Sequence, residues 1–582
     1  MSMEKERTDG KYEVSIKEQT SNSLSDSSTK EKHGFFSKAI DFLNKLSLEG
    51  SHGLPVKDLF LYNYDLKPLE SKRRTWHWYN YVYFCISECF NVNTWQIAGT
   101  GVQNGLNWWS CYLTVWIGYI FCGCFISAFA RIGNAYHIGF PVSCRSSFGI
   151  WGSLWPVLNR VVLACVWFGV QSSIGGNCVE LMLRAIFGND LETRIPNHLS
   201  GNITSFKMLS FFLFWFSQIP FIIIPPHKLK YFFALKAAIS PIAGISFLIW
   251  TLVKAHDVGP MMRASSSISG SAYAWTFVSA VMSCLSNLST LIINAPDFSR
   301  FANAPEAAIW TQMLTLPISY SCTCLIGILV CSAANYMYDE SYWNPLDVLS
   351  RFLDHQTPGN RAGVFLLGTC FSIAQLTSNI AANSLSAGTD MTAIFPKFIN
   401  IRRGGLICAA IGYAICPWNL MSSSNNFTTY LSAYSVFLSS IAGCIFADYY
   451  LIKKGYIIID QLFIAEKSSP YYYTWGINFR CYAAYICGIL PNIVGFVGAT
   501  KTHEVPIGAT RTYTLSFFTG FLAASTSLFI ITLIWPVDGT PCGMLERKWF
   551  EEWQEVEDFD ENFRRLHCKD LESFSEESNT SV

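Results

Sequence analysis

The chain has 582 residues, of which 51% are hydrophobic, 15% aromatic and only 14% charged. A soluble protein with so few charged residues could not cover its surface with polar groups, and a disordered chain needs the opposite balance. Lys plus Arg and Asp plus Glu both number 41, so no net charge favours nucleic acid as a partner. The composition predicts an all-α integral membrane protein with the lipid bilayer as its surroundings.

Two polar tails are expected at the ends of the chain. Residues 1–72 are rich in Ser, Lys, Glu and Thr, and residues 541–582 are acidic and rich in Ser and Glu. Segments of this composition do not bury enough apolar surface to form a core. We expect both to be cytosolic tails, open to the ubiquitination and endocytosis machinery.

Between the tails, residues 73–540 form the expected transmembrane domain. It holds about twelve runs long enough to cross about 30 Å of hydrocarbon as helices. The runs are near-continuous rather than alternating, which favours helices over a barrel. The expected spans are 78–100, 106–130, 155–186, 207–225, 231–253, 273–294, 309–335, 361–386, 405–420, 428–450, 481–499 and 513–535.

The charges of the loops predict the orientation. Cations such as Arg73, Arg74, Lys453 and Lys454 lie in alternate loops, while the other loops are richer in acidic residues. Because cytoplasmic loops carry the excess of Lys and Arg, both termini are expected in the cytosol. This orientation places the sequon at Asn202 outside, where glycosylation is topologically possible.

The first span is unusually polar. It contains Glu88, Asn91, Asn93 and Gln96 within about ten residues. Such groups are costly in lipid, and this density weakens a helix and frees backbone carbonyls to ligate a cation. Hydrogen bonding between helices is the alternative, but the density favours a site.

The sixth span carries a similar group of polar residues. Asn287 is followed by the stretch Asn294-Ala-Pro-Asp297, so this span is also expected to be interrupted. Broken helices at corresponding places in two halves indicate a transporter built from inverted repeats, with its site near the middle of the membrane.

The third and eighth spans supply further candidate ligands. Trp167 and Gln171 share one helical face, so an indole and a carboxamide could meet a planar heterocycle. An aromatic residue packed in the core is the alternative for Trp167. Thr377 and Ser378 offer hard oxygen donors for a small cation, and Asn383 offers a second amide for the ligand.

Motifs for enzymatic chemistry are absent from the sequence. The 20 Cys are scattered, and no CxxC, HExxH, Walker, Rossmann or nucleophile-elbow signature occurs. We therefore expect no catalytic residues, no metal site and no cofactor, and the protein is not expected to be an enzyme.

From about residue 62 to residue 562 the chain resembles nucleobase–cation symporter family one, in the branch of fungal uracil, allantoin and uridine permeases. The stretches that carry the resemblance are Lys72–Gly105, Trp167–Gln171, Asn294–Phe301, Asn383–Asn400 and Cys416–Met421. The resemblance implies the leucine-transporter fold, a five-plus-five inverted repeat followed by two helices. Repeat one would cover about 74–254, repeat two about 271–456, and the extra helices about 480–536.

The resemblance also implies roles for the substrate-facing residues. Trp167 would stack on the ring, Gln171 and Asn383 would bind its opposite amide edges, and Asn91 would face the substrate from the broken first helix. Asn287 or Leu288 stands where bacterial relatives place an aromatic residue on helix six.

A cation site is implied as well, between the first and eighth helices. Its residues would be Ser87, Phe90, Ala374, Thr377 and Ser378, with Glu88 as a carboxylate for coupling. The coupling ion is expected to be a proton, with sodium as the alternative.

The expected function is proton-driven import of a small planar heterocycle across the plasma membrane by alternating access. Uracil is the first candidate substrate, followed by allantoin, uridine or another purine- or pyrimidine-related compound. A nutrient receptor that binds without transport is an alternative from another class, and a channel fits the binding-type aromatic residue less well.

Overall fold

The structure is a computed structural model. It describes residues 56–537 except 64, 200–202, 225–228, 257–261, 305, 341 and 501–503. The predicted C-terminal tail and Asn202 lie outside the described residues, as do residues 1–55 of the predicted N-terminal tail. Most of residues 56–72 are described, and they begin with the short helix α2 (Val56–Leu61). The described part is helical, and its two β-bridges are isolated.

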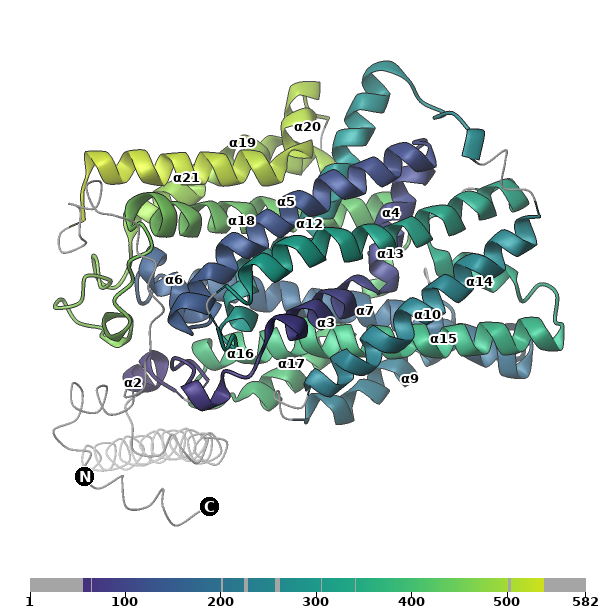
Figure 1. Ribbon diagram of the computed structural model, residues 1–582, viewed down its shortest axis with the longest axis horizontal. Coiled ribbons are helices and arrows are strands. Elements are labelled where there is room, and N and C mark those ends of the chain that lie inside the picture. Colours follow the sequence, from purple (N-terminus) through teal and green to yellow (C-terminus); the bar gives the residue numbers. More distant parts are fainter. Residues whose placement is uncertain are drawn as a thin grey trace, which may run out of the picture.

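The long helices run along one axis of the molecule (Figure 1). The membrane helices and their connecting elements are α3 (Trp78–Cys89), α4 (Val92–Gln103), α5 (Trp108–Tyr136), α6 (Phe140–Phe148), α7 (Leu154–Phe187), α9 (Ser205–Ile222), α10 (Leu229–Ala255), α12 (Gly270–Ser299), α13 (Ile309–Tyr338), α14 (Pro345–Arg351), α15 (Pro358–Ser378), α16 (Leu385–Ile394), α17 (Ile401–Ala414), α18 (Ser424–Phe446), α19 (Phe479–Ala499), α20 (Ile507–Thr514) and α21 (Ser516–Ile534).

Ten helical segments of the described chain are long and apolar enough to cross a membrane. The first and ninth predicted spans are not among these ten segments, because each forms shorter helices. The first span is divided into α3 and α4, of 12 residues each, and the ninth is α17, of 14 residues. With these two, the elements follow the twelve predicted spans in order.

The first predicted interruption is confirmed. Helix α3 ends at Cys89, and α4 begins at Val92. Asn91 is the N-cap of α4, since its Oδ1 accepts a hydrogen bond from the Thr94 backbone N–H at 2.8 Å. Its Nδ2 donates to the Glu88 carbonyl at 2.6 Å. One side chain therefore satisfies backbone groups on both sides of the break.

The second predicted interruption is wrong, because α12 is continuous from Gly270 to Ser299. Asn294, assigned by its hydrogen bonds, donates to the carbonyls of Thr290 at 3.1 Å and Leu291 at 3.0 Å within the same helix. Asn287 instead bonds residues of other helices. The eighth span does have irregular backbone, since a π-helical segment, η4 (Asn379–Ser384), joins α15 to α16.

The helices form two groups that mix the two halves of the chain. The first group, the bundle, contains α3, α4, α5, α12 and α13, and the second, the scaffold, contains α7, α9, α15, α16 and α17. Each group thus holds corresponding helices from both halves, as the five-plus-five repeat predicts. Helix α10 packs against α3, α13 and α15 and so touches both groups.

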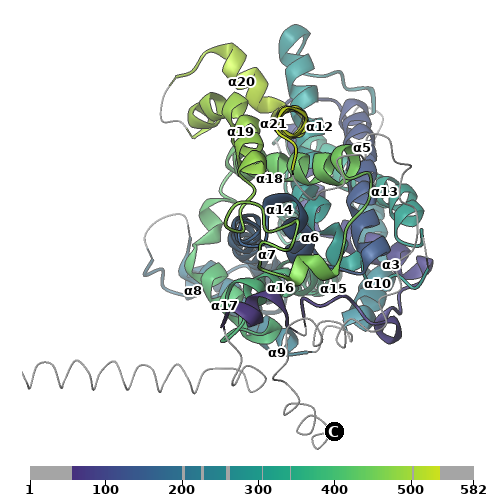
Figure 2. The same cartoon turned by 90° about the vertical axis from the view of Figure 1, so that its left-hand side faces the viewer.

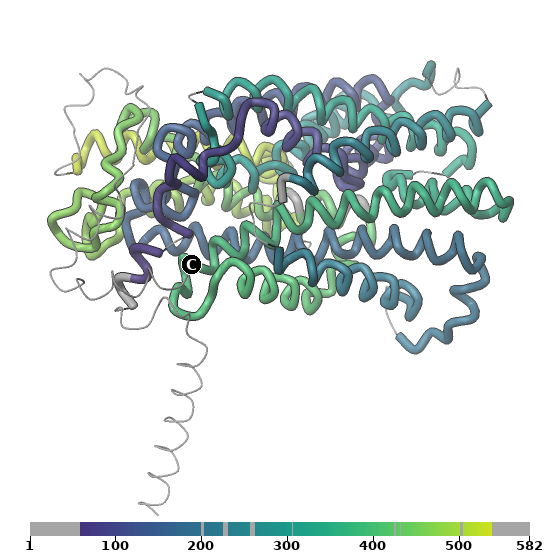
Figure 3. The backbone as a smooth tube through the Cα atoms, turned by 60° about the horizontal axis from the view of Figure 1, so that its bottom comes forward, coloured from purple at the N-terminus to yellow at the C-terminus, as the bar shows by residue number. Residues whose placement is uncertain are grey.

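The last two helices, α19 and α21, belong to neither group, although aromatic rings of α21 pack against Phe121 and Phe125 of α5. Figure 2, which looks along the helices, shows α19 and α21 on one side of the molecule beside α18, and these three pack against one another. Figure 3 follows the backbone and shows the first, broken helix lying beside the helices of the second half. Where α4 meets the connection before α14, a Cβ on Gly99 would lie 2.4 Å from the Trp343 carbonyl oxygen.

Candidate functional site

A cavity of about 80 Å³ lies between the broken first helix, α7, α12 and η4. Its lining residues are Glu88, Asn91, Asn93, Trp167, Gln171, Asn287, Leu288, Thr290, Leu291, Asn294, Tyr320, Ser378, Ala382 and Asn383. All five predicted substrate-binding residues are among them, together with Glu88 and Ser378. The volume is well below the roughly 300–1,000 Å³ of pockets for drug-sized ligands, so the cavity suits a small ligand.

Trp167 forms an aromatic wall of this cavity. It is buried, and its ring centroid lies 5.9 Å from that of Tyr430 and 6.2 Å from that of Tyr434. The Tyr434 hydroxyl donates to the Ser286 carbonyl of α12 at 2.8 Å. The indole is thus supported by two tyrosines of α18, and an aromatic face of this kind can stack on a planar ring. The sequence reasoning did not single out either tyrosine.

A chain of amides fixes the orientation of Asn383. Its Nδ2 donates to the Asn379 Oδ1 at 2.8 Å, and the Asn379 Nδ2 donates to the Gln218 Oε1 at 2.7 Å. The same Asn379 nitrogen also lies 3.1 Å from the Ser172 Oγ and from the Phe168 carbonyl. With its nitrogen engaged, Asn383 has its carbonyl oxygen left to accept a hydrogen bond from a ligand.

Gln171 offers the second amide. Its Oε1 is buried and has no hydrogen-bond partner among the described residues. A buried polar atom without a partner costs free energy unless a ligand or water satisfies it. Gln171 and Asn383 therefore present two amide groups to a ligand that would stack on Trp167.

Asn91 and Asn287 also line the cavity, but protein groups already engage their polar atoms. Asn91 holds the break between α3 and α4, as described above. The Asn287 Oδ1 accepts from the Asn93 Nδ2 at 2.9 Å, and its Nδ2 lies 3.4 Å from the Tyr119 hydroxyl. Asn287 thus forms a polar link between α4, α5 and α12.

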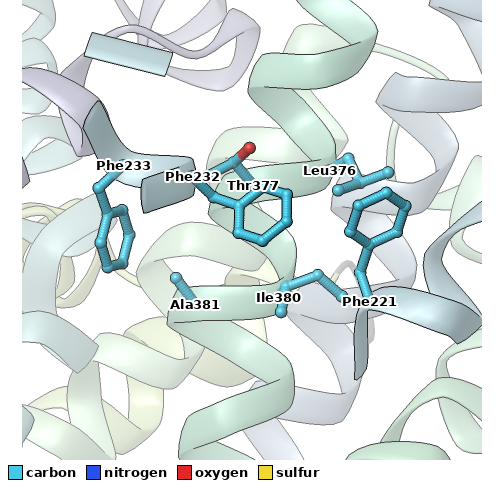
Figure 4. Close-up of a pocket in the computed structure, with 7 residues that line it drawn as sticks. All are labelled: Phe221, Phe232, Phe233, Leu376, Thr377, Ile380 and Ala381. Atoms are coloured by element: carbon cyan, nitrogen blue, oxygen red, sulfur yellow. The ribbon is translucent and has the colours of Figure 1, made fainter. Parts of the chain in front are cut away.

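The residues of the predicted cation site are distributed over different surroundings. Phe90 is the C-cap of α3, Ala374 is buried in α15, and the Ser87 hydroxyl is buried without a partner among the described residues. The Thr377 hydroxyl donates to the Ile373 carbonyl of its own helix at 2.9 Å. Its side chain lines a separate, small apolar pocket with Phe221, Phe232, Phe233, Leu376, Ile380 and Ala381 (Figure 4).

Ser378 has a cationic partner that the sequence reasoning missed. The fully buried ammonium of Lys236, on α10, donates a hydrogen bond to the Ser378 hydroxyl. Lys236 also interacts electrostatically with the buried carboxylate of Glu88, whose Oε1 has no hydrogen-bond partner among the described residues. A lysine within the apolar fifth span was a visible signal, since charges inside membrane segments mark functional sites.

A second buried charge cluster lies where α12 ends. The Arg160 Nη1 is 2.7 Å from the Asp297 Oδ2, and Arg160 binds Asp390 through two further nitrogens. Asp297 also accepts the Phe140 backbone N–H at 2.8 Å. The cluster joins α12 of the bundle to α7 and α16 of the scaffold.

The helix order, the two mixed groups and the cavity beside the broken first helix define a membrane protein with the leucine-transporter fold. Two solved structures have this fold. The inward-facing Mhp1 structure has a TM-score of 0.66 at 17% identity, over 83% of this chain and 97% of that one. The closed Mhp1 structure with bromovinylhydantoin bound has a TM-score of 0.64 at 18% identity, over 84% and 99% of the two chains.

The sequence comparisons identify the family. Residues 68–520 match the family described as permeases for cytosine/purines, uracil, thiamine and allantoin. The chain is 50% identical to the allantoin permease of Saccharomyces cerevisiae over 88% of this chain and 82% of that protein. It is 47% identical to the uracil permease of the same yeast, over 92% of this chain and 86% of that protein. It is 50% identical to the uridine permease of that yeast, over 87% of this chain and 80% of that protein. The chain belongs to this family of nucleobase–cation symporters, and it is a transporter rather than an enzyme.

Proposed function

We propose that the protein imports a small planar heterocycle together with a proton, and that uracil is its substrate, with allantoin and uridine as the alternatives. The observation that carries the proposal is the meeting of Trp167, Gln171 and Asn383 in one small cavity beside Glu88. A ring stacked on Trp167 would donate an N–H to Asn383 and use its opposite edge to bind Gln171.

The size of the cavity favours a free base over a nucleoside. About 80 Å³ leaves little room for a ribose beside the ring. The similarity to the three yeast permeases does not separate their substrates, since the identities lie between 47% and 50%. The cavity therefore argues against uridine, and uptake assays with all three compounds separate uracil from allantoin.

The contacts of Lys236 support a proton rather than sodium as the coupling ion. The Lys236 ammonium donates a hydrogen bond to the Ser378 hydroxyl, and the Thr377 hydroxyl donates to a carbonyl of its own helix. A sodium ion beside the Ser378 hydroxyl would meet the fixed positive charge of Lys236. Glu88 lacks a hydrogen-bond partner for one oxygen, which leaves that oxygen available for a proton.

In this mechanism the proton changes how the bundle is held. Glu88 lies on α3 of the bundle, while Lys236 lies on α10, which also packs against the scaffold. Protonation of Glu88 would remove its attraction to Lys236 and loosen α3 from α10. Proton binding would thereby favour the movement of the bundle that alternating access needs.

Uptake of labelled uracil, allantoin and uridine into transporter-free yeast cells tests the proposal. We expect uracil to accumulate against its gradient, and a protonophore to abolish the accumulation. Glu88→Gln should still bind and exchange uracil but lose the dependence of accumulation on external pH. Binding without accumulation in the wild type would instead indicate a receptor.

Substitution of Trp167 tests the substrate pose separately. Trp167→Ala should weaken uracil binding by about 1–3 kcal/mol, the usual loss for a base that stacks on an aromatic side chain. Trp310→Ala is the control, since Trp310 lies exposed on α13 and does not line the cavity. Unchanged affinity in Trp167→Ala would show that the indole is only part of the core.

We also propose the plasma membrane as the location, with both termini in the cytosol. The alternating cationic loops support this orientation. The tails would then be accessible to the ubiquitination machinery. Protease digestion of sealed cells, which should leave tags on both termini intact, tests the orientation.

A further inference from the structure

A groove of about 330 Å³ opens between α7, α18 and α19, away from the substrate cavity. Its lining residues are Trp155, Leu158, Asn159, Val162, Leu163, Tyr430, Ala433, Tyr434, Phe437 and Phe496. The lining residues on α7 recur three or four positions apart, and so do those on α18. Each set therefore forms one face of its helix. Leu158 and Val162 are 42% and 54% exposed, so the groove is open at the surface of membrane-spanning helices.

The chemistry of the groove selects its occupant. The three helices are long and apolar enough to cross a membrane, so the groove faces lipid rather than water. Trp155, Phe437 and Phe496 provide flat aromatic walls, against which a rigid ring skeleton packs with little loss of conformational freedom. The Asn159 Nδ2 donates to the Trp155 carbonyl at 2.9 Å, which leaves the Asn159 Oδ1 to accept a hydroxyl hydrogen.

We propose that this groove binds a membrane sterol, with its hydroxyl at Asn159 and its rings between α7 and α18, and that occupancy raises substrate affinity through Tyr430. A flexible acyl chain would fill the same space, but it would lose more conformational freedom there and has no hydroxyl for Asn159. The site lies outside the substrate cavity and does not depend on the identity of the substrate.

Two tyrosines connect the groove to the substrate cavity. Tyr430 and Tyr434 line the groove, and both rings also pack against Trp167. Tyr434 is fixed to α12 through the Ser286 carbonyl, whereas the buried Tyr430 hydroxyl has no hydrogen-bond partner among the described residues. The position of the Tyr430 ring therefore depends on packing. A sterol in the groove would hold it against Trp167.

A photoreactive sterol in phosphatidylcholine vesicles tests the site directly. Purified protein is labelled, digested and mapped by mass spectrometry, with a photoreactive phosphatidylcholine as the parallel probe. We expect sterol label to concentrate on the peptides around Leu158 and Ala433. Ala433→Trp and Val162→Trp, which fill the groove from opposite walls, should each lower this labelling about tenfold. Leu522→Trp, at an exposed position of α21, is the control and should have no effect.

Uptake by the same proteins tests the coupling. The KM of the wild type should be about threefold lower in vesicles with sterol than without it, and the two groove-filling variants should not respond to sterol. Label spread evenly over the exposed helices would overturn the site, and equal labelling of the groove peptides by phosphatidylcholine would overturn the sterol assignment. Groove labelling without a sterol-dependent KM would overturn the proposed effect of the sterol on substrate affinity. Labelling does not require transport. If the proposed transport function fails, the labelling result still shows whether the groove binds sterol, so the two failures can be told apart.

Discussion

The first helices of the two halves, α3–α4 and α12, both carry amide side chains around the same cavity, but they differ in backbone. In the first half Asn91 accepts the Thr94 backbone N–H and caps a new helix. In the second half the Asn294 amide bonds carbonyls one turn back, and Asn287 bonds Asn93 and Tyr119. The comparison teaches that a break requires a side chain that caps the backbone, and that polar density alone does not predict one.

The largest expected effect on stability concerns the end of α12, which buried charges hold in place. Arg160→Leu would leave Asp297 and Asp390 buried without their cation. Removing one partner of a buried ion pair costs about 3–5 kcal/mol. We expect a protein that unfolds well below the wild-type temperature in detergent, or that is retained inside the cell.

Arg194→Leu is the control, because Arg194 forms an exposed pair with Asp190 at 3.6 Å. Surface pairs of this kind contribute little. Equal stability of the Arg160 and Arg194 variants would mean that the buried cluster does not anchor α12.

The broken helix is supported in another way, by α14. The Gln96 Nε2 of α4 donates to the Asn344 Oδ1 at 3.0 Å, and the Asn344 Nδ2 donates to the Asp347 Oδ1 at 3.0 Å. Desolvation by the residues packed around it raises the pKa of Asp347 to about 6, although the residue is partly exposed and the Asn344 hydrogen bond and Lys207 act to lower this pKa. The folded protein thus binds this proton more tightly than the unfolded chain does.

The sign of the pH effect follows from this raised pKa. Asp347 contributes most stability below its ordinary pKa of about 4, and the contribution is lost as the pH rises through about 6. Because Asp347 is exposed to solvent, which screens its charge, the change should reach only about 1–2 kcal/mol. The unfolding temperature of the wild type should fall as the pH rises from about 4 to about 6, and that of Asp347→Asn should fall less. The prediction would be contradicted if Asp347→Asn kept the wild-type pH dependence of the unfolding temperature, or if Asp354→Asn reduced that dependence equally.

The smallest expected effect compares the two amides directly. Asn91→Ala removes a cap and should lower stability by about 1 kcal/mol. Asn287→Ala removes no cap but leaves the buried Asn93 amide without its acceptor, so it should lower stability by a similar amount and also change the ranking of competing substrates. Thermal unfolding and competition assays on both variants measure this. A clearly larger stability loss in Asn287→Ala than in Asn91→Ala, or an unchanged ranking of substrates, would contradict this prediction.

Much of the fold could be predicted because membrane spans depend on local composition. Long apolar runs and the polar first span indicated the helices and the break at Asn91. The continuous α12 and the π-helical η4 could not be predicted, since they depend on which partner each amide finds in three dimensions. For the same reason Asn287 gave no sign that Asn93 and Tyr119 would be its partners.

The candidate site shows the same limit. Trp167, Gln171 and Asn383 were visible as unusual residues within apolar spans, and the structure brings them to one cavity. Two of their supports were not visible, because Tyr430 and Tyr434 are ordinary residues in their span, whereas Gln218 was a visible polar residue that was overlooked. Lys236 was visible but overlooked. Its contact with Ser378 depends on the packing of α10 against α15, which no sequence pattern gives.

Proton flux in sodium-free proteoliposomes tests the central claim most directly. With purified wild-type protein and a pH-sensitive dye inside the vesicles, added uracil should acidify the interior as substrate and proton enter together. Glu88→Gln should allow uracil exchange without acidification. Uracil uptake that requires sodium and moves no protons would contradict the coupling role of Glu88 and Lys236.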